Sequence, residues 1–403
     1  MYSHSISTLK LNFAEKSDNV MTRTIITLFL LQFLILKGLV AQITLSNLEK
    51  KDEIESKSFR LKSLSELPPL SIDSEKQGFE HSFSQKIPNF QSTNTVATTH
   101  FSDLLVPSDT FNRHRFWFLV GTGTSAYIGS IALLNNLWYA QYPRSRFHLF
   151  NDEGEWMQID KAGHIISAYQ ASKWVYGAMR WSGMKNRNSA WFGMAVGTMF
   201  QATIETLDGF SSEWGFSWAD ITANTTGCAL FGLQQAAWDE QRIVIKVSNT
   251  PRKYPLTPIR SIDGSKTTTI RERTNDLYGD NYTQTFFKDY NALIFWLSIN
   301  PKSFYKNSRL PDWLNVALGY GADNMYGGYK NEWPAKAPEF RLSDTEYPRY
   351  RQYYLSFDID LSRIKTKSKF VKSLARTFNF VKIPSPTLEF NTLGKVKFHP
   401  LLF

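Results

Sequence analysis

Four largely apolar segments dominate the pattern of polar and apolar positions between residues 111 and 240. Residues 116–134 carry no charge, and arginines and aromatic residues flank them. A segment of this length fits the hydrocarbon core of a bilayer, and its flanks fit the two boundaries. Three similar segments follow at residues 160–182, 189–204 and 221–238. The pattern predicts four helices.

Small residues recur in these segments at a spacing of four, as in Gly193 with Gly197 and Ala223 with Gly227. This spacing lets helix backbones approach closely, a device common among helices in lipid. A soluble four-helix bundle with small-residue seams is the alternative. We therefore expect a mainly α fold: a four-helix bundle embedded in or associated with a membrane, followed by a mixed α/β extension.

The chain after residue 240 has weaker patterns. Residues 241–284 are basic and rich in Pro and Thr, which predicts a loop. Residues 290–299 are apolar and fit either a strand or a buried helix. Residues 311–321 start with Pro and end with Gly, which predicts a short helix. Residues 285–403 would together form a mixed C-terminal region.

Three patterns are clearer in this C-terminal region. Residues 352–361 alternate, with Leu355 and Phe357 on one face and Asp358 on the other, which predicts a half-buried strand. Residues 367–381 predict a basic amphipathic helix, with Phe370, Leu374 and Phe378 on one face. This helix fits either an anionic membrane surface or packing on its own protein. The last residues, from 387 on, predict a hairpin.

The N-terminal region carries an export signal. From Met21 the chain reads MTRTIITLFLLQFLILKGLVAQ, with Arg23 ahead of an apolar run and Ala41 at the expected cleavage point. We interpret residues 1–41 as an extension and signal peptide, with an uncleaved anchor helix as the alternative. Residues 42–110 are rich in Ser, Lys, Glu and Asn and predict a disordered tether. Either interpretation predicts an exported chain.

Composition narrows the classes of partner. The chain has 403 residues, a net charge of +10 and 15% aromatic residues, and its pI is about 9.4. This charge favours membrane lipids or anionic envelope components, and aromatic residues suit a membrane–water boundary. No nucleic-acid-binding motif accompanies the charge, so nucleic acid is not expected as a partner. The single cysteine, Cys228, excludes an intramolecular disulfide and a cysteine-based zinc site.

Polar residues stand at matching ends of three of the apolar segments. Residues four apart share a helix face, and helices joined by short connections pack in alternating directions. The start of the second segment, the end of the third and the start of the fourth should therefore meet at one end of the bundle. The candidate site residues are Asp160, His164, Glu205, Asp208, Asp220 and Asn224.

Such a cluster has three interpretations. Glu205, Asp208 and Asp220 could hold a divalent metal, which prefers oxygen ligands. All six candidates could instead serve general acid–base catalysis, with His164 as the proton-transfer group. The third interpretation is structural, with hydrogen bonds that organise the bundle. The pattern indicates no particular cofactor.

The motifs DKAGH, E-x-x-D-G and FSWADITANTTG, in this order, resemble the YfiM-like family of uncharacterised predicted periplasmic lipoproteins. The resemblance covers residues 147–238. The shorter patterns DK-x-x-H and D-x-x-x-N-x-x-G are similar to VanZ-type membrane proteins. The shared positions are Asp160, Lys161, His164, Glu205, Asp208, Gly209, Asp220, Asn224 and Gly227.

The resemblance implies a small helical domain on the periplasmic side of the cell envelope and no established activity. The chain departs from the lipoprotein pattern because no cysteine stands at the expected cleavage point. We expect an exported, membrane-associated module with a binding or structural role. The alternative is a membrane-embedded hydrolase of a phosphate-containing or polyprenyl lipid, although no nucleophile elbow is present. Whether the chain is an enzyme stays open at this stage.

Overall fold

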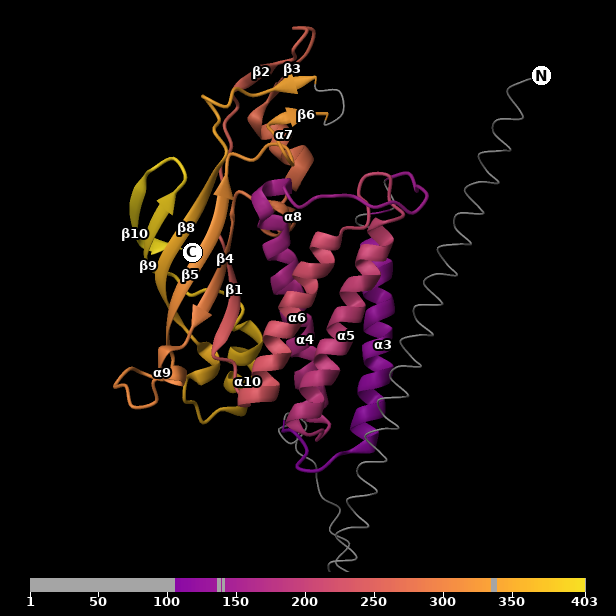
Figure 1. Ribbon diagram of the computed structural model, residues 1–403, viewed down its shortest axis with the longest axis vertical. Coiled ribbons are helices and arrows are strands. Elements are labelled where there is room, and N and C mark those ends of the chain that lie inside the picture. The colour runs from indigo at the N-terminus through magenta and orange to yellow at the C-terminus, as the bar shows by residue number, and fades with distance from the viewer. Residues whose placement is uncertain (1–105, 136–138, 140–141, 335–338, 403) are drawn as a thin grey trace, which may run out of the picture. The chain divides into compact units, whose positions relative to one another are not determined.

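The computed structural model describes residues 106–402, apart from 136–138, 140–141 and 335–338. The expected signal peptide and all but the last few residues of the expected tether lie outside these residues. The described part has a helical first half and a second half built on a sheet (Figure 1). The expected mainly α fold therefore describes the chain only as far as about residue 240.

The four predicted helices are present. They are α3 (Arg113–Leu134), α4 (Ile159–Trp181), α5 (Asn186–Asp208) and α6 (Trp218–Trp238). Side chains cap two of them: Asn112 accepts a hydrogen bond from the N–H of Arg115, and Ser217 accepts one from the N–H of Asp220. Such caps satisfy N–H groups that have no partner within the helix.

Helices α4, α5 and α6 pack closely through glycines. A Cβ atom on Gly227 of α6 would lie 2.1 Å from the carbonyl oxygen of Ile165, and one on Gly193 of α5 would lie 2.5 Å from that of Ser172. Neither position has room for a side chain. The small residues in the sequence thus bring the three backbones together, as their spacing predicted.

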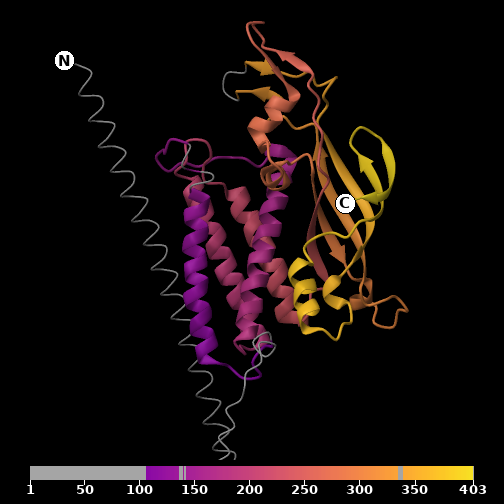
Figure 2. The ribbon, with the colours of Figure 1, turned by 180° about the vertical axis from the view of Figure 1, so that it is seen from behind.

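Helix α3 differs from the other three. Its contacts with the bundle include those between the rings of Phe116 and Phe192 and a 2.7 Å hydrogen bond between the hydroxyls of Tyr127 and Thr203. It lies on the side of the bundle away from the sheet (Figures 1 and 2). Among the described residues it is the one helix long and apolar enough to cross a membrane, and little of it is buried. The expected bundle is therefore a three-helix core with α3 alongside.

Six antiparallel strands form the main sheet, in the order β1-β4-β5-β8-β9-β10. They are β1 (Ile243–Asn249), β4 (Leu293–Ile299), β5 (Leu314–Asp323), β8 (Tyr350–Ile359), β9 (Ser385–Asn391) and β10 (Val396–Leu402). Strands β9 and β10 are the predicted terminal hairpin, and β8 is the predicted alternating strand.

Short elements connect these strands. The strands are β2 (Pro258–Arg260), β3 (Thr267–Thr269), β6 (Glu332–Trp333) and β7 (Phe340–Arg341). The helices are α7 (Ile270–Tyr278), α8 (Tyr282–Lys288), α9 (Pro301–Phe304) and α10 (Lys369–Phe378), with 3-10 turns η2 (Glu155–Gln158) and η3 (Leu361–Arg363).

Two expectations for this region are wrong. Residues 311–321 form most of β5 rather than a helix, because β4 and β8 pair with them on both sides. Residues 241–284 are not a loop, since they contain β1 and α7. A lysine within an apolar run usually indicates a strand at the surface. Lys246 interrupts the apolar run of β1 in this way, yet its side chain is fully buried.

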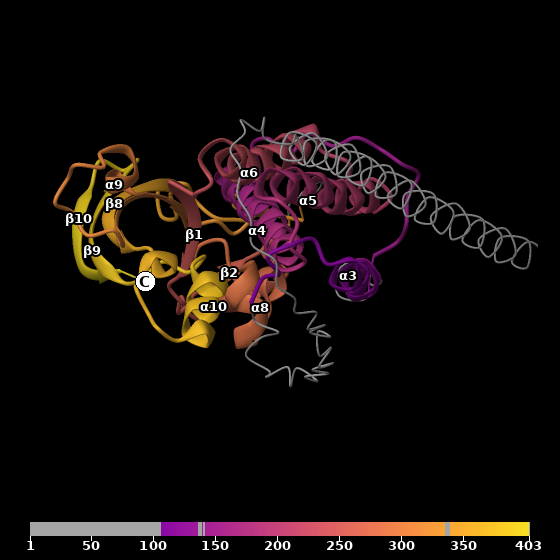
Figure 3. The ribbon, with the colours of Figure 1, turned by 90° about the horizontal axis from the view of Figure 1, so that it is seen from below.

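The inner face of the sheet combines buried polar residues with a small apolar cluster around Trp296, whereas the outer face is apolar. Seen from below, the strands curl so that one face is concave (Figure 3). Lys246 and Asp358 are buried on the inner face, with Nζ 2.7 Å from Oδ2. Ser298 donates a hydrogen bond of 2.6 Å to the same carboxylate. The predicted half-buried strand β8 therefore buries its polar face and exposes Leu355 and Phe357.

Strands β1 and β4 carry the contact between sheet and bundle. Ile245 and Phe295 of the sheet belong to one buried apolar cluster with Ile159, Ile166 and Phe231 of the helices. Strand β1 lies beside the bundle, and β10 lies at the other edge of the sheet (Figures 1 and 3). The bundle covers one end of the outer face and leaves the remainder uncovered.

Helix α10 confirms the predicted basic amphipathic helix. Its apolar residues Phe370, Leu374 and Phe378 are all exposed. The alternative in which this apolar face packs on the rest of the protein therefore does not hold for the described residues.

Candidate functional site

The candidate site begins with an unusual turn ahead of α4. Trp156, Met157 and Gln158 all have left-handed backbones, with φ of 48°, 51° and 64°. Such conformations are costly for residues other than glycine and persist where the surroundings impose them. Here the hydroxyl of Tyr320 in β5 bonds to the carbonyl of Met157, and Arg351 in β8 donates to Gln158 at 2.5 Å. The sheet thus fixes where α4 starts.

Lys161, in the first turn of α4, is the centre of the cluster. Its Nζ lies 2.7 Å from a carboxylate oxygen of Asp152, 3.1 Å from one of Asp160 and 2.6 Å from one of Asp220. The side chain is 11% exposed. Burial opposes its charge, but the three carboxylates outweigh this and raise the pKa of Lys161 above its ordinary value. The lysine is therefore held as an ammonium.

His164 lies one turn further along α4, between two sets of partners. Its Nε2 is 3.7 Å from Asp160 Oδ2 and 3.5 Å from Asp220 Oδ1. Its Nδ1 is 3.2 Å from Asn224 Oδ1 and 3.8 Å from Glu205 Oε1. The structure thus brings together five of the six candidates, from three helices.

Asp208 is the candidate that takes a different partner. Its Oδ1 accepts a 2.7 Å hydrogen bond from the hydroxyl of Tyr139. Glu205, one turn earlier on α5, is almost fully buried and accepts a long bond of 3.4 Å from the N–H of Ser217. Glu205 Oε1 and Asn224 Nδ2 are buried without a hydrogen-bond partner among the described residues. Glu205, Asp208 and Asp220, the expected metal ligands, therefore do not form a single group of ligands.

Three acids at this end of the bundle, Glu205, Asp208 and Asp220, have raised pKa values. Burial, with the charges of Asp220 and Asp208, raises the pKa of Glu205 to about 9. Burial also raises the pKa of Asp220 to about 7 and that of Asp208 to about 6. Asp152 differs: although burial opposes it, hydrogen bonds from Asp220, Lys161 and Ser217 lower its pKa. Glu205 is therefore a neutral acid at pH 7.

Sequence reasoning missed two members of the cluster. Asp152 comes from the segment before α4, where its carboxylate accepts a 2.5 Å hydrogen bond from the Ser217 hydroxyl. Tyr290 comes from the segment before β4, and its hydroxyl donates to Asp160 at 2.8 Å. No local pattern marks either residue, because both reach the cluster through tertiary contacts. Tyr169, in contrast, bonds to Gln241 and stays outside the cluster.

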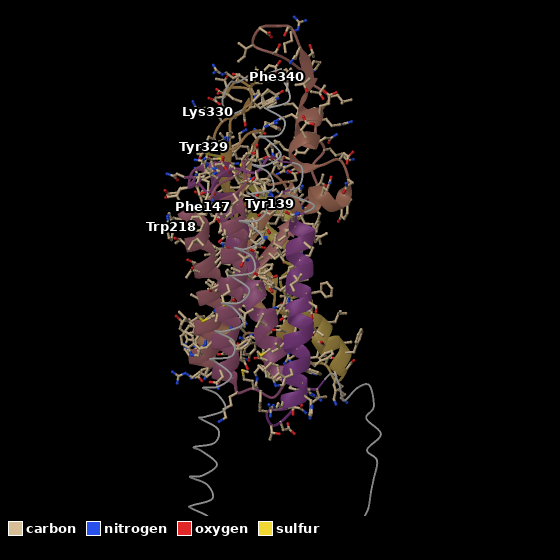
Figure 4. The ribbon with its side chains drawn as sticks, turned by 90° about the vertical axis from the view of Figure 1, so that its right-hand side faces the viewer. Tyr139, Phe147, Trp218, Tyr329, Lys330 and Phe340 are labelled. Atoms are coloured by element: carbon tan, nitrogen blue, oxygen red, sulfur yellow. The ribbon has the colours of Figure 1, made fainter. Side chains whose placement is uncertain are left out.

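Aromatic residues surround this end of the bundle. The Phe216 ring lies 5.6 Å from the Phe147 ring and 5.2 Å from the Trp218 ring, while the Trp214 ring lies 5.7 Å from the Tyr139 ring. Figure 4 shows Tyr139, Phe147 and Trp218 at the same end of the helices. Backbone bonds join the two segments, since Phe216 donates to the carbonyl of His148 and Phe150 donates to that of Phe216. The loop after α5 therefore caps the polar end.

One set of residues has the composition of a metal site. Single ligand atoms of Asp160, His164 and Asp220 lie within 4.8 Å of one another. However, the ammonium of Lys161 already contacts Asp160 Oδ2 and Asp220 Oδ1, the oxygens nearest to His164. A metal ion at this position would have to displace Lys161.

The comparisons with known proteins agree with the envelope location. Residues 149–236 match the model of a family described as predicted periplasmic lipoproteins, DUF2279. No curated protein and no solved structure matches the chain. The matched range includes every candidate site residue as well as Gly209 and Gly227. At these two positions an added Cβ would lie 2.4 Å from the Phe147 ring and 2.1 Å from the Ile165 carbonyl.

The shared positions thus divide into polar residues grouped around Lys161 and His164, Asp208 with its separate partner Tyr139, and glycines that permit close packing. The location on the periplasmic side of the envelope, expected from the sequence, agrees with the family's description. Residues 149–236, from the segment before α4 to the last turn of α6, are therefore the part of the chain that is similar to the predicted periplasmic lipoprotein family DUF2279.

Proposed function

We propose that this chain is a non-catalytic, membrane-associated module of the cell envelope, in which the polar cluster holds the helices in place. The observation that carries the proposal is the position of Lys161. Its ammonium contacts three carboxylates at 2.6 to 3.1 Å, where a metal-dependent site would need its ion. An internal cation of this kind joins α4, α6 and the segment before α4 without any ligand.

The surroundings of Lys161 support this structural role. Asp152 also binds the N-cap Ser217 of α6, and Asp160 also binds Tyr290 next to the sheet. One ammonium thus links contacts from the bundle, its capping loop and the sheet. Removing one partner of a buried charge cluster leaves the others uncompensated, which is strongly destabilising.

The test is to remove the internal cation. Lys161→Met should lower the free energy of unfolding of the purified full chain by about 3 kcal/mol, since three carboxylates lose their counter-charge. Divalent manganese should raise the melting temperature of this variant but not that of the unaltered chain. Lys330→Met, at an exposed lysine, is the matched control and should behave like the unaltered chain.

Elemental analysis of the same preparations tests the alternative that the cluster binds a metal ion. A metal ion bound at one per chain in the unaltered protein, and lost in Asp220→Asn, would overturn the structural role. So would a Lys161→Met protein whose stability does not change.

A hydrolase is the second candidate function, and one feature favours it. Asp160 and His164 remain 23% and 20% exposed, so part of the cluster is accessible. An open pocket lies close by along the chain, lined by Asn151, Glu153, Gly154, Gln158 and Tyr329. In this alternative Glu205, neutral at pH 7, would be the acid and His164 the base, acting on a phosphate-containing lipid. Loss of a measured hydrolytic activity in His164→Ala, with unchanged stability, would favour it.

A further inference from the structure

The outer face of the main sheet is apolar across its whole width. One row of paired residues runs through all six strands as Ile245, Leu297, Leu318, Leu355, Leu388 and Phe398. The next row runs as Val247, Phe295, Tyr320, Tyr353, Phe390 and Val396. Neither row contains a charged residue.

The bundle covers only the first part of these rows. Ile245 and Phe295 are buried against α4 and α6. Beyond them every side chain of the two rows except Tyr320 is 36% to 64% exposed, although these side chains are as large and as apolar as the covered ones. The outer apolar face comprises Leu318, Tyr353, Leu355, Phe357, Leu388, Phe390, Val396, Phe398 and Leu401. It is a continuation of an interface that the bundle already fills in part.

We propose that the outer apolar face contacts the acyl chains of a lipid bilayer. A sheet in water places its polar residues outward, but this sheet buries Lys246, Asp358 and Glu389 and exposes leucines and phenylalanines. Exposed apolar area of this extent marks an interaction surface. Outward apolar and inward polar alternation is the arrangement that suits a strand facing lipid.

The depth of the face limits how far it can enter a bilayer. From Leu314 to Tyr320 along β5 it extends for about 20 Å at roughly 3.4 Å per residue, which is less than the roughly 25 Å apolar band of a spanning sheet. On the exposed strand β8 the face reaches Tyr353, and Arg351 stands two residues further along the same strand. A tyrosine followed by a charged residue is typical of a membrane–water boundary.

Two other exposed apolar surfaces favour lipid over a partner protein. Helix α3, on the opposite side of the bundle, exposes most of its length. Helix α10 exposes Phe370, Leu374 and Phe378 beside Lys372 and Arg376, a combination suited to anionic headgroups. Three surfaces on separate elements would need three protein partners, whereas one bilayer can cover them all. The inference rests on the proposed membrane association and adds to it the sheet as a lipid-facing element.

The test compares two neighbouring residues on β10 that point in opposite directions. Phe398 is 63% exposed on the outer face, and the side chain of Lys397 is 50% exposed on the inner face. Phe398→Cys and Lys397→Cys would each be labelled with an environment-sensitive fluorophore. The native Cys228 is buried, so the unaltered chain provides the labelling control.

The labelled full-length chains would be reconstituted into vesicles of phosphatidylethanolamine and phosphatidylglycerol that contain a lipid with a nitroxide on its acyl chain. We expect at least a twofold greater loss of fluorescence at position 398 than at position 397. A second outer position, Leu355→Cys, should behave like 398. Flotation of the vesicles measures membrane association separately.

Two outcomes would overturn the inference. If the chain floats with the vesicles but position 398 is quenched by aqueous iodide and not by the nitroxide, the sheet does not face lipid, while the membrane association stands. If position 398 is shielded from both quenchers and cross-links to a second copy, the face is a protein interface. A chain that does not float contradicts the membrane association itself.

Discussion

Two buried clusters of charged residues in this molecule differ in which charge is in excess. At the polar end of the bundle, Asp152, Asp160 and Asp220 surround the single ammonium of Lys161. Inside the sheet, Lys246 and Lys382 lie around the single carboxylate of Asp358, because Nζ of Lys246 is 2.7 Å from it and its charge also acts on Lys382. Acids are in excess in the first cluster, and lysines are in excess in the second.

The pKa values follow from these imbalances. Burial and neighbouring acids raise the pKa of Glu205 to about 9. Burial, with the charge of Lys246, lowers the pKa of Lys382 to about 8, against the opposing effect of Asp358. In each cluster, the excess charge is reduced when one group becomes neutral. In the bundle Glu205 keeps its proton at neutral pH, and in the sheet interior Lys382 loses its proton at a lower pH than an ordinary lysine.

The two clusters also differ in how completely they are bonded. In the sheet, Asp358 accepts from Ser298 at 2.6 Å and from the N–H of Ile383 at 3.2 Å, and Lys246 donates to the carbonyl of Ile359 at 2.7 Å. In the bundle, Glu205 Oε1 and Asn224 Nδ2 have no partner among the described residues. The bundle cluster therefore contains incompletely bonded buried atoms, whereas the atoms named around Asp358 are all bonded.

The largest expected effect is the loss of Asp358. Asp358→Asn should lower the free energy of unfolding by about 3–5 kcal/mol, since two buried lysines lose the carboxylate between them. Chemical denaturation of the purified full chain measures this. The control is Asp312→Asn, where the side chain is 43% exposed and pairs with Lys302, and where a change of at most about 1 kcal/mol is expected. Equal effects of the two variants would remove the contrast between core and surface.

The second prediction concerns the dependence of stability on pH in the bundle cluster. Because the pKa of Glu205 is raised in the folded chain, its stabilising effect is fully present below about pH 4.5 and is lost as the pH rises to about 9. Glu205→Gln should therefore flatten the fall in stability over this window, by about 1.4 kcal/mol per pH unit at most. Glu213→Gln, at an exposed position, should leave the slope unchanged.

The sheet interior should show the opposite slope. The pKa of Lys382 is lowered in the folded chain, so between about pH 8 and pH 10.5 the unfolded chain binds the extra proton and stability rises with pH. Lys382→Met should remove this rise, which is again about 1.4 kcal/mol per pH unit at most. Melting temperatures across this pH range provide the measurement. If Glu205 and Lys382 changed the stability in the same direction with rising pH, the two clusters would not have opposite charges in excess.

The smallest expected effect is at the junction of bundle and sheet. Tyr290→Phe removes the hydroxyl that donates to Asp160 at 2.8 Å and should cost about 1 kcal/mol of stability. Tyr282→Phe alters a tyrosine that is 72% exposed and should have no measurable effect. Thermal unfolding of both variants compares them directly. If Tyr290→Phe leaves stability unchanged, the sheet does not support the cluster through this bond.

Much of the candidate site could be predicted from the sequence. The helical pattern places Asp160 and His164 on one face of α4, and alternating helix directions bring them to Glu205, Asp220 and Asn224. Distances of 3.2 to 3.8 Å from the His164 ring confirm this convergence. The argument could not predict Lys161 as the central cation or the bond from Tyr139 to Asp208. Those pairings depend on side-chain directions that residue spacing does not specify.

The sequence by itself determined the apolar helices, the alternation of residues 352–361 and the terminal hairpin, because periodicity and turn residues act locally. Only the tertiary structure decided which face of an alternating strand is buried. Alternation divides Leu355 from Asp358 but does not say which side meets solvent, and here the polar side is inside. Likewise, residues 311–321 became a strand because two neighbouring strands pair with them. Hydrogen bonds to partners distant in the chain outweigh a local preference for a helix.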